Sequence, residues 1–363
     1  ALMMSMAGLG PPRLKVGFVD QDETNGNVAR ARQLVGRMVD WQDAWGETRP
    51  NRLARSPQPA NGESHFMATR VERLAPAPDD LWCPHPSGGM TMKFEDIFAK
   101  SMMSPEHQQL MEQLYLPEEH TMELDRGYKG RPHIGAPAIA STMLGGQDSP
   151  FWRKLTDAID AARGQTELRI FLAGSVFGGT GAAGFPTLAR MMRKALAPKG
   201  GQPVAKVKIG GLLMLPYFSF PPPQAGQPGD VARDGELLLQ SQAALRYYGE
   251  LFEGEQADLF DELFLLGWSP RIKLGYHESG KGQQVNPPLA PELVAATSAL
   301  GFLGGREIRA DNPVYVAARE RENGISWEDV PEVRVPGDVR ARLGQALRFA
   351  LYWRYQLNGE LNE

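Results

Sequence analysis

The chain reads Leu168-Arg-Ile-Phe-Leu-Ala-Gly174-Ser-Val-Phe-Gly178-Gly179-Thr180-Gly181-Ala-Ala-Gly184-Phe-Pro186 near its middle. The apolar run at the start of this stretch is typical of a buried strand, and the glycines that follow are typical of a tight loop. Pro186 then opens a segment whose apolar residues recur at helical spacing, so a helix is expected from that proline onward. The stretch therefore predicts a strand, a glycine-rich loop and a helix in succession.

The glycine-rich loop suits a phosphate group. Gly178, Gly179 and Gly181 have no side chains, so consecutive backbone N–H groups can approach a ligand closely. The helix that follows adds about half a positive charge at its N-terminus. Thr180 offers a hydroxyl donor within the loop, and Ser175 offers a second one just upstream. The loop predicts a phosphate site, while a plain glycine turn that packs a helix against a sheet stays open as the alternative.

The same glycines also satisfy the dinucleotide-binding pattern G-x-G-x-x-G at residues 179–184. That pattern needs an acidic residue near the end of the next strand, where it holds the ribose hydroxyls. The next expected strand covers residues 207–215 and runs into Pro216 without a carboxylate. An oxidoreductase that uses NAD(P) is therefore a weaker alternative.

The run from Gly178 to Ala182 resembles the signature loop of the tubulin/FtsZ superfamily, to which bacterial tubulin-like proteins belong. The resemblance implies an α/β fold with a parallel-sheet nucleotide-binding domain, a central helix and a second, smaller α/β domain. It also implies a protein that binds GTP and self-assembles, with the nucleotide lying across several loops at the carboxyl edge of the sheet. The residues that would bind the nucleotide in this stretch are Gly174, Ser175, Gly178, Gly179, Thr180, Gly181 and Ala182.

The resemblance also suggests how the chain is divided. Residues 1–285 would form the nucleotide-binding domain, 286–304 the central helix and 305–363 part of the second domain. Residues 41–92 lose helical periodicity and gain proline, so we interpret them as a surface insertion with one strand. The first residues read as the end of a helix, and the family's first strand and first phosphate loop would precede it. Part of the nucleotide site is therefore expected to lie before this sequence.

Composition limits the class of protein. A chain of 363 residues with 42% hydrophobic and 23% charged residues predicts a globular protein of roughly two domains, rather than a fibrous or disordered one. The net charge of −4 gives no overall attraction to nucleic acid, and no apolar run approaches the length of a membrane span. We expect neither kind of contact. The single cysteine, Cys83, excludes an intramolecular disulfide and fits the reducing cytoplasm.

Two carboxylates follow the strand expected at residues 14–20. This strand ends at Asp20, and Asp22 comes shortly after it. Carboxylates beside a phosphate loop can hold Mg²⁺ or accept ribose hydroxyls, but an Asx-rich turn that caps the next helix explains them equally well. By resemblance, Asp20 and Asp22 fall where a loop of the family meets the metal and the nucleotide, so Mg²⁺ is expected together with GTP.

A basic loop precedes the signature loop in sequence. It reads Gly127-Tyr-Lys129-Gly130-Arg131-Pro132 and stands ahead of a helical stretch, a place that suits anions. It resembles the family's loop over the terminal phosphate, in which Lys129 and Arg131 would be the charged contacts. Two solvated cations in a turn are the alternative interpretation.

The base would be recognised from a helix expected over residues 235–248. In the family an Asn on the corresponding helix binds the guanine edge, and Gln240 lies closest to that position here, with Gln242 as the second choice. Glutamine carries the same amide donor and acceptor on a longer arm. Guanine is therefore expected from the loop order, while the substitution leaves the identity of the base open.

Candidate catalytic residues stand at the start of the helix expected from Pro291 onward. In the resembled family, an acidic loop there meets the nucleotide of the next subunit in a filament, and its carboxylates position the attacking water. Asn286 and Glu292 match that loop in kind, but Pro288 stands where the family has an acid. Glu292 can orient a water or simply favour the helix N-terminus. A GTP-binding protein that assembles head to tail into filaments is therefore expected. GTP hydrolysis stays open, with a switch or scaffold without hydrolysis as the alternative.

Overall fold

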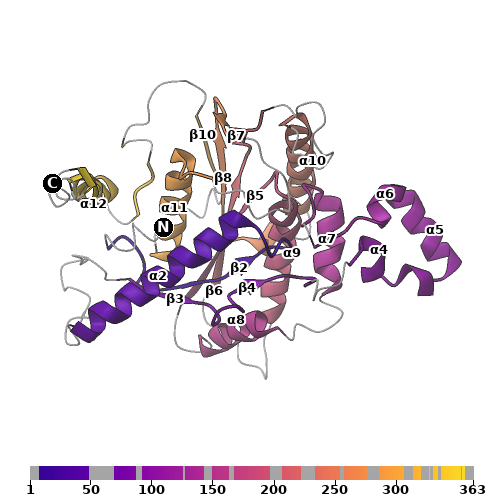
Figure 1. Cartoon of the computed structure of the whole chain (residues 1–363), viewed down its shortest axis with the longest axis horizontal. Helices are drawn as coiled ribbons and strands as arrows, with labels where there is room; N and C mark the ends of the chain where they lie inside the picture. Colours follow the sequence, from indigo (N-terminus) through magenta and orange to yellow (C-terminus); the bar gives the residue numbers. More distant parts are fainter. Residues whose placement is uncertain are drawn as a thin grey trace.

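The computed structural model describes residues 8–48, 69–86, 92–125, 127–142, 149–162, 167–196, 207–221, 234–253, 257–275, 286–305, 314–319, 327, 330–333, 337–352 and 354–355. A four-stranded sheet lies at the centre, with helices on both sides (Figure 1). None of the helices described is long and apolar enough to cross a membrane. The expected α/β class with a parallel sheet is confirmed.

The central sheet is parallel throughout and has the order β10-β8-β6-β5. Its strands are β5 (Leu168–Ser175), β6 (Val207–Met214), β8 (Glu262–Trp268) and β10 (Val314–Arg319). Because the strands are parallel, their carboxyl ends share one edge, where open α/β sheets bind ligands. β5 delivers the glycine-rich loop to that edge.

Two helices sandwich this sheet, namely α9 (Gly179–Ala195) and α11 (Ala290–Leu303). A methyl group built on Gly210 of β6 would lie 2.9 Å from the ring of Phe302, and one on Gly211 would lie 2.5 Å from the ring of Phe185. Successive strand residues point to opposite faces, so α11 and α9 cover opposite faces of the sheet. The two glycines allow both helices to pack closely.

The expected strand at residues 14–20 forms as two short pieces. β1 (Arg13–Val16) pairs in parallel with β3 (Arg70–Arg73), and β2 (Phe18–Val19) pairs in parallel with β4 (Leu81–Trp82). The pieces separate at Gly17, where a Cβ would lie 2.6 Å from the Phe151 ring.

The surface insertion expected over residues 41–92 stays a prediction, although its described parts pack against the body. Helix α2 (Gly26–Thr48) continues past residue 41, and the buried side chains of Val71 and Trp82 belong to the hydrophobic core. The proline-rich composition gave no sign of these buried positions, because strands β3 and β4 are too short to show an alternation of apolar and polar residues. Residues 49–68 and 87–91 of the expected insertion lie outside the described residues.

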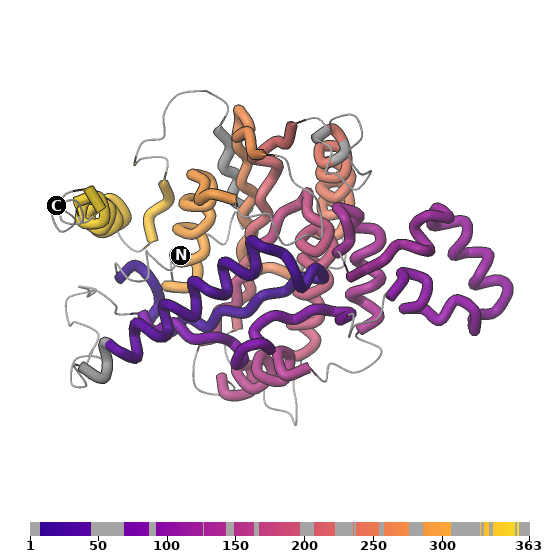
Figure 2. The backbone as a smooth tube through the Cα atoms, in the orientation of Figure 1, coloured from indigo at the N-terminus to yellow at the C-terminus, as the bar shows by residue number. Residues whose placement is uncertain are grey.

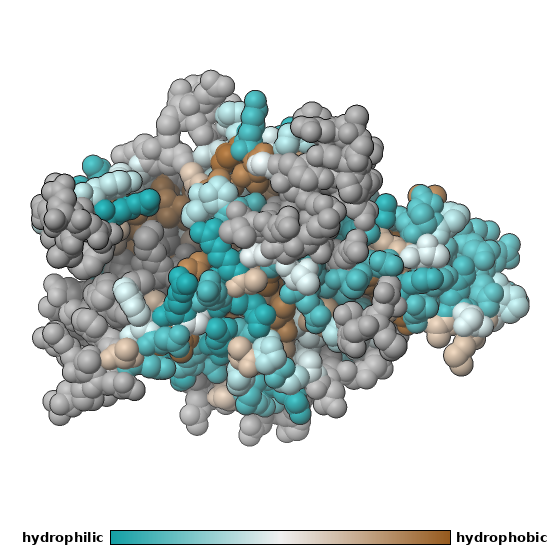
Figure 3. All heavy atoms as spheres, in the orientation of Figure 1, coloured by the Kyte–Doolittle hydropathy of each residue, from teal (hydrophilic) through white to brown (hydrophobic). Residues whose placement is uncertain are grey.

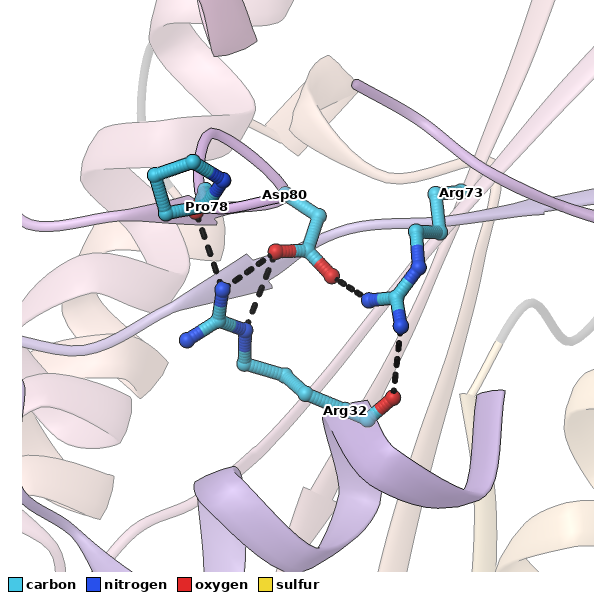
Figure 4. A network of polar contacts seen from close by, with 4 residues as sticks. All are labelled: Arg32, Arg73, Pro78 and Asp80. Atoms are coloured by element: carbon cyan, nitrogen blue, oxygen red, sulfur yellow. Dashed lines mark hydrogen bonds and ion pairs between the residues drawn. The ribbon is translucent and has the colours of Figure 1, made fainter. Parts of the chain in front are cut away.

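A buried carboxylate ties α2 to the β3–β4 segment (Figure 4). The Asp80 side chain is fully buried and accepts hydrogen bonds from Arg32 at 3.0 and 2.6 Å, and also from Arg73. Arg32 further donates to the carbonyl of Pro78 at 3.0 Å, and Arg73 donates to the carbonyl of Arg32 at 3.2 Å. Charge-assisted bonds of this kind are strong and directional, so the network fixes how α2 lies on the short strands.

A group of small helices projects from the body as a helical arm, defined here as residues 92–124 (Figure 1). It contains α4 (Phe94–Ile97), η1 (Lys100–Met102), α5 (Pro105–Leu114) and α6 (Pro117–His120). Its two ends meet at the root, where the Phe94 N–H donates to the Met122 carbonyl and the Leu124 N–H donates to the Met92 carbonyl, both at 3.0 Å. The arm is thus a closed unit whose root adjoins the basic loop.

The remaining elements complete the body. They are α7 (Pro132–Ser141), α8 (Pro150–Ala161), β7 (Phe218–Ser219), α10 (Asp234–Glu253), η2 (Ala257–Leu259), β9 (Ile272–Lys273) and α12 (Asp338–Tyr352). β7 and β9 pair in parallel beyond the carboxyl edge of the central sheet. Among them, α10 confirms the helix expected over residues 235–248.

The second domain expected from residue 305 onward stays a prediction, because only parts of that segment are among the described residues. β10 pairs with β8 in the central sheet, and α12 packs Val339 and Leu343 into a cluster with Leu300 of α11 and Leu9. The backbone trace shows the same arrangement, with the yellow C-terminal helix beside the α11 side of the body (Figure 2). Local sequence patterns do not specify this pairing between distant strands.

Candidate functional site

The signature loop, residues 178–182, forms the N-terminus of α9. Gly178 is the N-cap of this helix and Gly179 is its first residue, so the helix starts earlier than the expected Pro186. Pro186 lies inside α9 and lacks the N–H that would bond to the Ala182 carbonyl. The Tyr248 hydroxyl donates to that carbonyl instead, which explains how the helix tolerates the proline.

The first amides of α9 are open. The Ala182 N–H donates to the Gly178 carbonyl at 3.0 Å, as the first intrahelical bond. No acceptor for the N–H groups of Gly178, Gly179, Thr180 or Gly181 is found within the described part of the chain. Leading amides of a helix have no partner in their own helix, and they carry the positive end of its dipole. The loop therefore presents neighbouring donors that suit an anion.

Close packing accounts for two of the glycines. A Cβ on Gly181 would lie 2.8 Å from the Ser175 carbonyl oxygen and 2.9 Å from the Ser175 nitrogen. A Cβ on Gly179 would lie 2.8 Å from Tyr128 Cβ and 3.1 Å from the Gly130 nitrogen. A plain glycine turn would explain these contacts equally well, so the open amides, and not the glycines themselves, point to a ligand.

Asp20 lies against the signature loop. The Thr180 hydroxyl donates to Asp20 Oδ1 at 3.0 Å, and Asn25 donates to Asp20 Oδ2 at 3.1 Å. Burial raises the pKa of Asp20 to about 6, although the hydrogen bonds from the Asp22 amide and from Thr180 act in the opposite direction. The structure thus brings a carboxylate of raised pKa to the mouth of the loop.

Asp22 plays a different local role. Its Oδ1 accepts from the Thr24 N–H at 2.9 Å and from the Thr24 hydroxyl at 2.7 Å, which is the Asx turn expected as the alternative. Its Cβ lies 3.4 Å from the position of a Cβ on Gly127, so it also borders the basic loop. Asp20 and Asp22 are both at the site, but only Asp20 bonds to the signature loop.

The described residues around the signature loop could bind Mg²⁺ only together with a nucleotide. Among the described residues, no group of three or more His, Cys, Asp or Glu side chains could hold a metal ion. Mg²⁺ is usually held by one or two carboxylates together with substrate phosphates and waters, so it needs no such cage. Asp20 would supply the carboxylate, and the other ligands would come from the nucleotide. Burial and nearby acids raise the pKa of Cys83 to about 12, so its thiol is protonated at neutral pH.

The basic loop, residues 127–131, lies between the signature loop and α10. A methyl group on Gly130 would lie 2.9 Å from Gln240 Oε1, so the predicted base-recognising amide borders this loop. Gly130 has φ +73°, and Lys129 has φ 46°, a left-handed conformation that is unusual outside glycine. The structure therefore brings Lys129, Gln240 and the signature loop together.

Arg131 is engaged by the helical arm. One of its guanidinium nitrogens lies 3.2 Å from Met122 Sδ, and Nε lies 3.9 Å from Glu119 Oε1. Burial raises the pKa of Glu119, but hydrogen bonds from the Leu116 amide and His133 and the nearby charge of Arg131 lower it below its usual value. The arm thus holds the side chain that was predicted to contact the terminal phosphate.

Asn286 and Glu292 are held within their own chain. The Asn286 N–H donates to Asn27 Oδ1 at 2.8 Å, and Arg30 donates to the Asn286 carbonyl at 2.9 Å, which places residue 286 against the start of α2. Glu292 accepts from the Leu289 N–H and from the Tyr217 hydroxyl, both at 3.2 Å. The first of these contacts is a helix cap. Contact with the nucleotide of a neighbouring subunit stays a prediction.

Sequence reasoning missed Gln21, which is fully buried behind the site. Its Nε2 donates to the carbonyls of His85 at 2.7 Å and Leu124 at 3.2 Å, and its Oε1 accepts from the His85 N–H at 3.1 Å and the Tyr128 hydroxyl at 3.2 Å. Its own N–H donates to Thr180 Oγ1 at 3.3 Å. This side chain uses its full hydrogen-bonding capacity to join the arm root, the basic loop and the signature loop. The only sequence signal was a polar residue between two acids.

Gln21→Leu is therefore expected to weaken nucleotide binding by about 10-fold, because each buried polar group left unpaired costs about 1–3 kcal/mol and the two loops lose their common anchor. Gln42→Leu is the matched control. Gln42 is equally buried and bonds to Thr69 and Val71 away from the site. Calorimetric titration of both variants, well below their unfolding temperatures, measures the difference. Equal losses of affinity in the two variants would assign Gln21 a purely structural role.

The comparisons with known proteins agree with this geometry. The family model described as tubulin-like matches residues 127–231, a segment that contains both the basic loop and the signature loop. No similar curated protein and no similar solved structure was found. This segment of the chain is therefore similar to the tubulin-like family, and the match includes the two loops that meet at Gly179.

Proposed function

We propose that this chain binds GTP, with the phosphates seated on the backbone N–H groups at the N-terminus of α9. The observation that carries the proposal is the row of open amides at residues 178–181, which lie at the carboxyl edge of a parallel sheet. Backbone donors together with the helix dipole form a natural phosphate site. The tubulin-like family match over this segment supports a nucleotide in preference to other anions.

The other site residues have complementary roles in this proposal. Ser175 would add a hydroxyl donor, and Lys129 would add positive charge at the phosphates. Thr180 would contribute its backbone N–H, because its hydroxyl proton is donated to Asp20. Asp20, largely ionised at neutral pH because its pKa is about 6, would hold a Mg²⁺ ion shared with the phosphates. Such an ion neutralises phosphate charge when bound. Gln240 would read the base with its amide, at the edge of the basic loop.

Hydrolysis and head-to-tail assembly are the further family properties that we propose. Glu292 would orient water for a neighbouring subunit's nucleotide, with Asn286 beside it. A binding protein without turnover is the second candidate, because both carboxylate oxygens of Glu292 are engaged by Leu289 and Tyr217 and Pro288 replaces an acid. Turnover that rises with protein concentration would decide for the GTPase.

The test is a titration of GTP, ATP and NAD against the full chain, with Mg²⁺ and with a chelator, while light scattering is followed in parallel. The expected result is tightest binding of GTP, weakened by the chelator. Preference for NAD would overturn the proposal in favour of an oxidoreductase, and preference for ATP would correct the base assigned to Gln240. Absence of any nucleotide binding would leave the glycine loop with a packing role alone.

A further inference from the structure

The helical arm carries exposed apolar side chains that its own packing does not use. Its interior is formed by residues such as Phe94 and Met111, both buried. On α5, Leu110 is 50% exposed and Leu114 is 62% exposed. Glu106, Leu110 and Leu114 recur at a spacing of four, so they form one stripe along the helix. Figure 3 shows the arm standing out from the body, with apolar atoms set in a hydrophilic surface.

The surface around this stripe is acidic. Residues 92–124 contain seven Asp and Glu residues and two lysines. Glu112 lies 3.5 Å from Lys100, and Glu119 is buried at the root, whereas Glu106 and Glu118 are exposed. Two arms brought together would repel each other. The arm is therefore suited to a partner that is both basic and apolar.

Helix α12 has the complementary character. Its N-terminal half is anchored by Val339 and Leu343, but Leu347 and Leu351 are exposed, the latter by 57%. Leu347 and Leu351 form a stripe at the same spacing of four. Arg348 and Arg354 are exposed next to it, while the one acidic residue of this helix, Asp338, is buried.

We propose that the arm of one copy docks along α12 of a second copy, with Leu110 and Leu114 against Leu347 and Leu351. Glu106 on one side and Arg348 on the other would set the orientation by charge. The two surfaces lie at opposite ends of the longest axis of the molecule (Figure 1). A contact between two different surfaces joins subunits head to tail, so it generates an open chain or a ring of subunits.

This inference goes beyond the proposed function, because it names a contact between copies that involves neither Glu292 nor the nucleotide. Two short helices bury little surface, below the roughly 1,200 Å² of a standard stable interface. The contact is therefore weak when isolated. Assembly should rise with protein concentration and fall with added salt, since the flanking charges are exposed and screened.

The decisive experiment mixes two variants of the full chain. The arm variant combines Leu110→Glu with Leu114→Glu, and the α12 variant combines Leu347→Glu with Leu351→Glu. Each keeps one intact surface, so each alone should be monomeric in sedimentation velocity, while their mixture should form dimers that grow no further. Assembly of either variant alone, or a mixture that stays monomeric, would overturn the proposal. Circular dichroism confirms that each variant is folded.

Charge reversal provides a second, independent measurement. Glu106→Arg should reduce assembly, and Arg348→Glu combined with it in the same chain should restore it. Leu239→Glu is the matched control, because Leu239 is 68% exposed on α10, away from both surfaces. This substitution should leave assembly unchanged. A loss of assembly in Leu239→Glu equal to that in the arm variant would contradict the contact. GTP affinity, measured on the same variants, should be unchanged, so failure of this inference and failure of nucleotide binding are told apart.

Discussion

Gly181→Ala should lower the affinity for GTP by about 100-fold, because it displaces the amides that are proposed to hold the phosphates. The added Cβ would lie 2.8 and 2.9 Å from backbone atoms of Ser175, which cannot move aside as a flexible side chain could. The loop must therefore shift away from the end of β5. Each hydrogen bond to a charged group contributes about 1.5–3 kcal/mol, so the loss of one or two of them gives an effect of this size.

The matched control is Gly184→Ala in the same helix. Its Cβ would lie 3.4 Å from Ile139 Cδ1 and 3.5 Å from Leu188 Cδ1, which is ordinary contact with flexible side chains. Alanine also favours the helix, so Gly184→Ala should keep both stability and affinity. Isothermal titration calorimetry on both variants, with thermal unfolding measured alongside, separates binding from folding. Unchanged affinity in a folded Gly181→Ala protein would remove the signature loop from the nucleotide site.

Local patterns predicted the elements around this loop well. The apolar run of β5, the glycines and the helical spacing of α9 all lie within one short stretch, so the sequence alone indicated their order. The start of α9 was misplaced because Pro186 looked like a first-turn proline. Only Tyr248, distant in the sequence, supplies the missing partner of the Ala182 carbonyl.

Contacts between distant segments were beyond such reasoning. Asp20 and Thr180 were each selected as candidates, but their hydrogen bond joins positions 160 residues apart and no local pattern predicts it. Gln21 went unnoticed for the same reason, because its role depends on His85, Leu124 and Tyr128. The pairing of β10 with β8 likewise joins distant segments, and no local pattern predicts it.

Asp20→Asn should have opposite effects on binding and on stability. In the presence of Mg²⁺, affinity for GTP should fall by about 100-fold, because the proposed carboxylate ligand of the ion is lost, and charged contacts of this kind contribute up to about 3 kcal/mol. In a chelator, where no ion is bridged, the variant and the parent chain should bind GTP about equally. Asp157→Asn is the control, because it removes the same charge from the exposed face of α8. If the loss of affinity for GTP persists in the chelator, Asp20 acts by holding the signature loop and not by binding the Mg²⁺ ion.

The stability effect follows from the raised pKa of Asp20. Its folded-state pKa of about 6 lies above the ordinary value of 3.8, so the folded chain binds the proton more tightly than the unfolded chain does. Ionised Asp20 therefore destabilises the fold above about pH 6, and this cost disappears as the pH falls toward about 4. Asp20→Asn should raise the free energy of unfolding by about 3 kcal/mol near pH 8 and by less than about 1 kcal/mol near pH 4. Denaturant unfolding of the nucleotide-free protein across this range measures the difference. A constant difference at every pH would mean that the hydrogen bonds of Asp20, and not its charge, set the stability of the site.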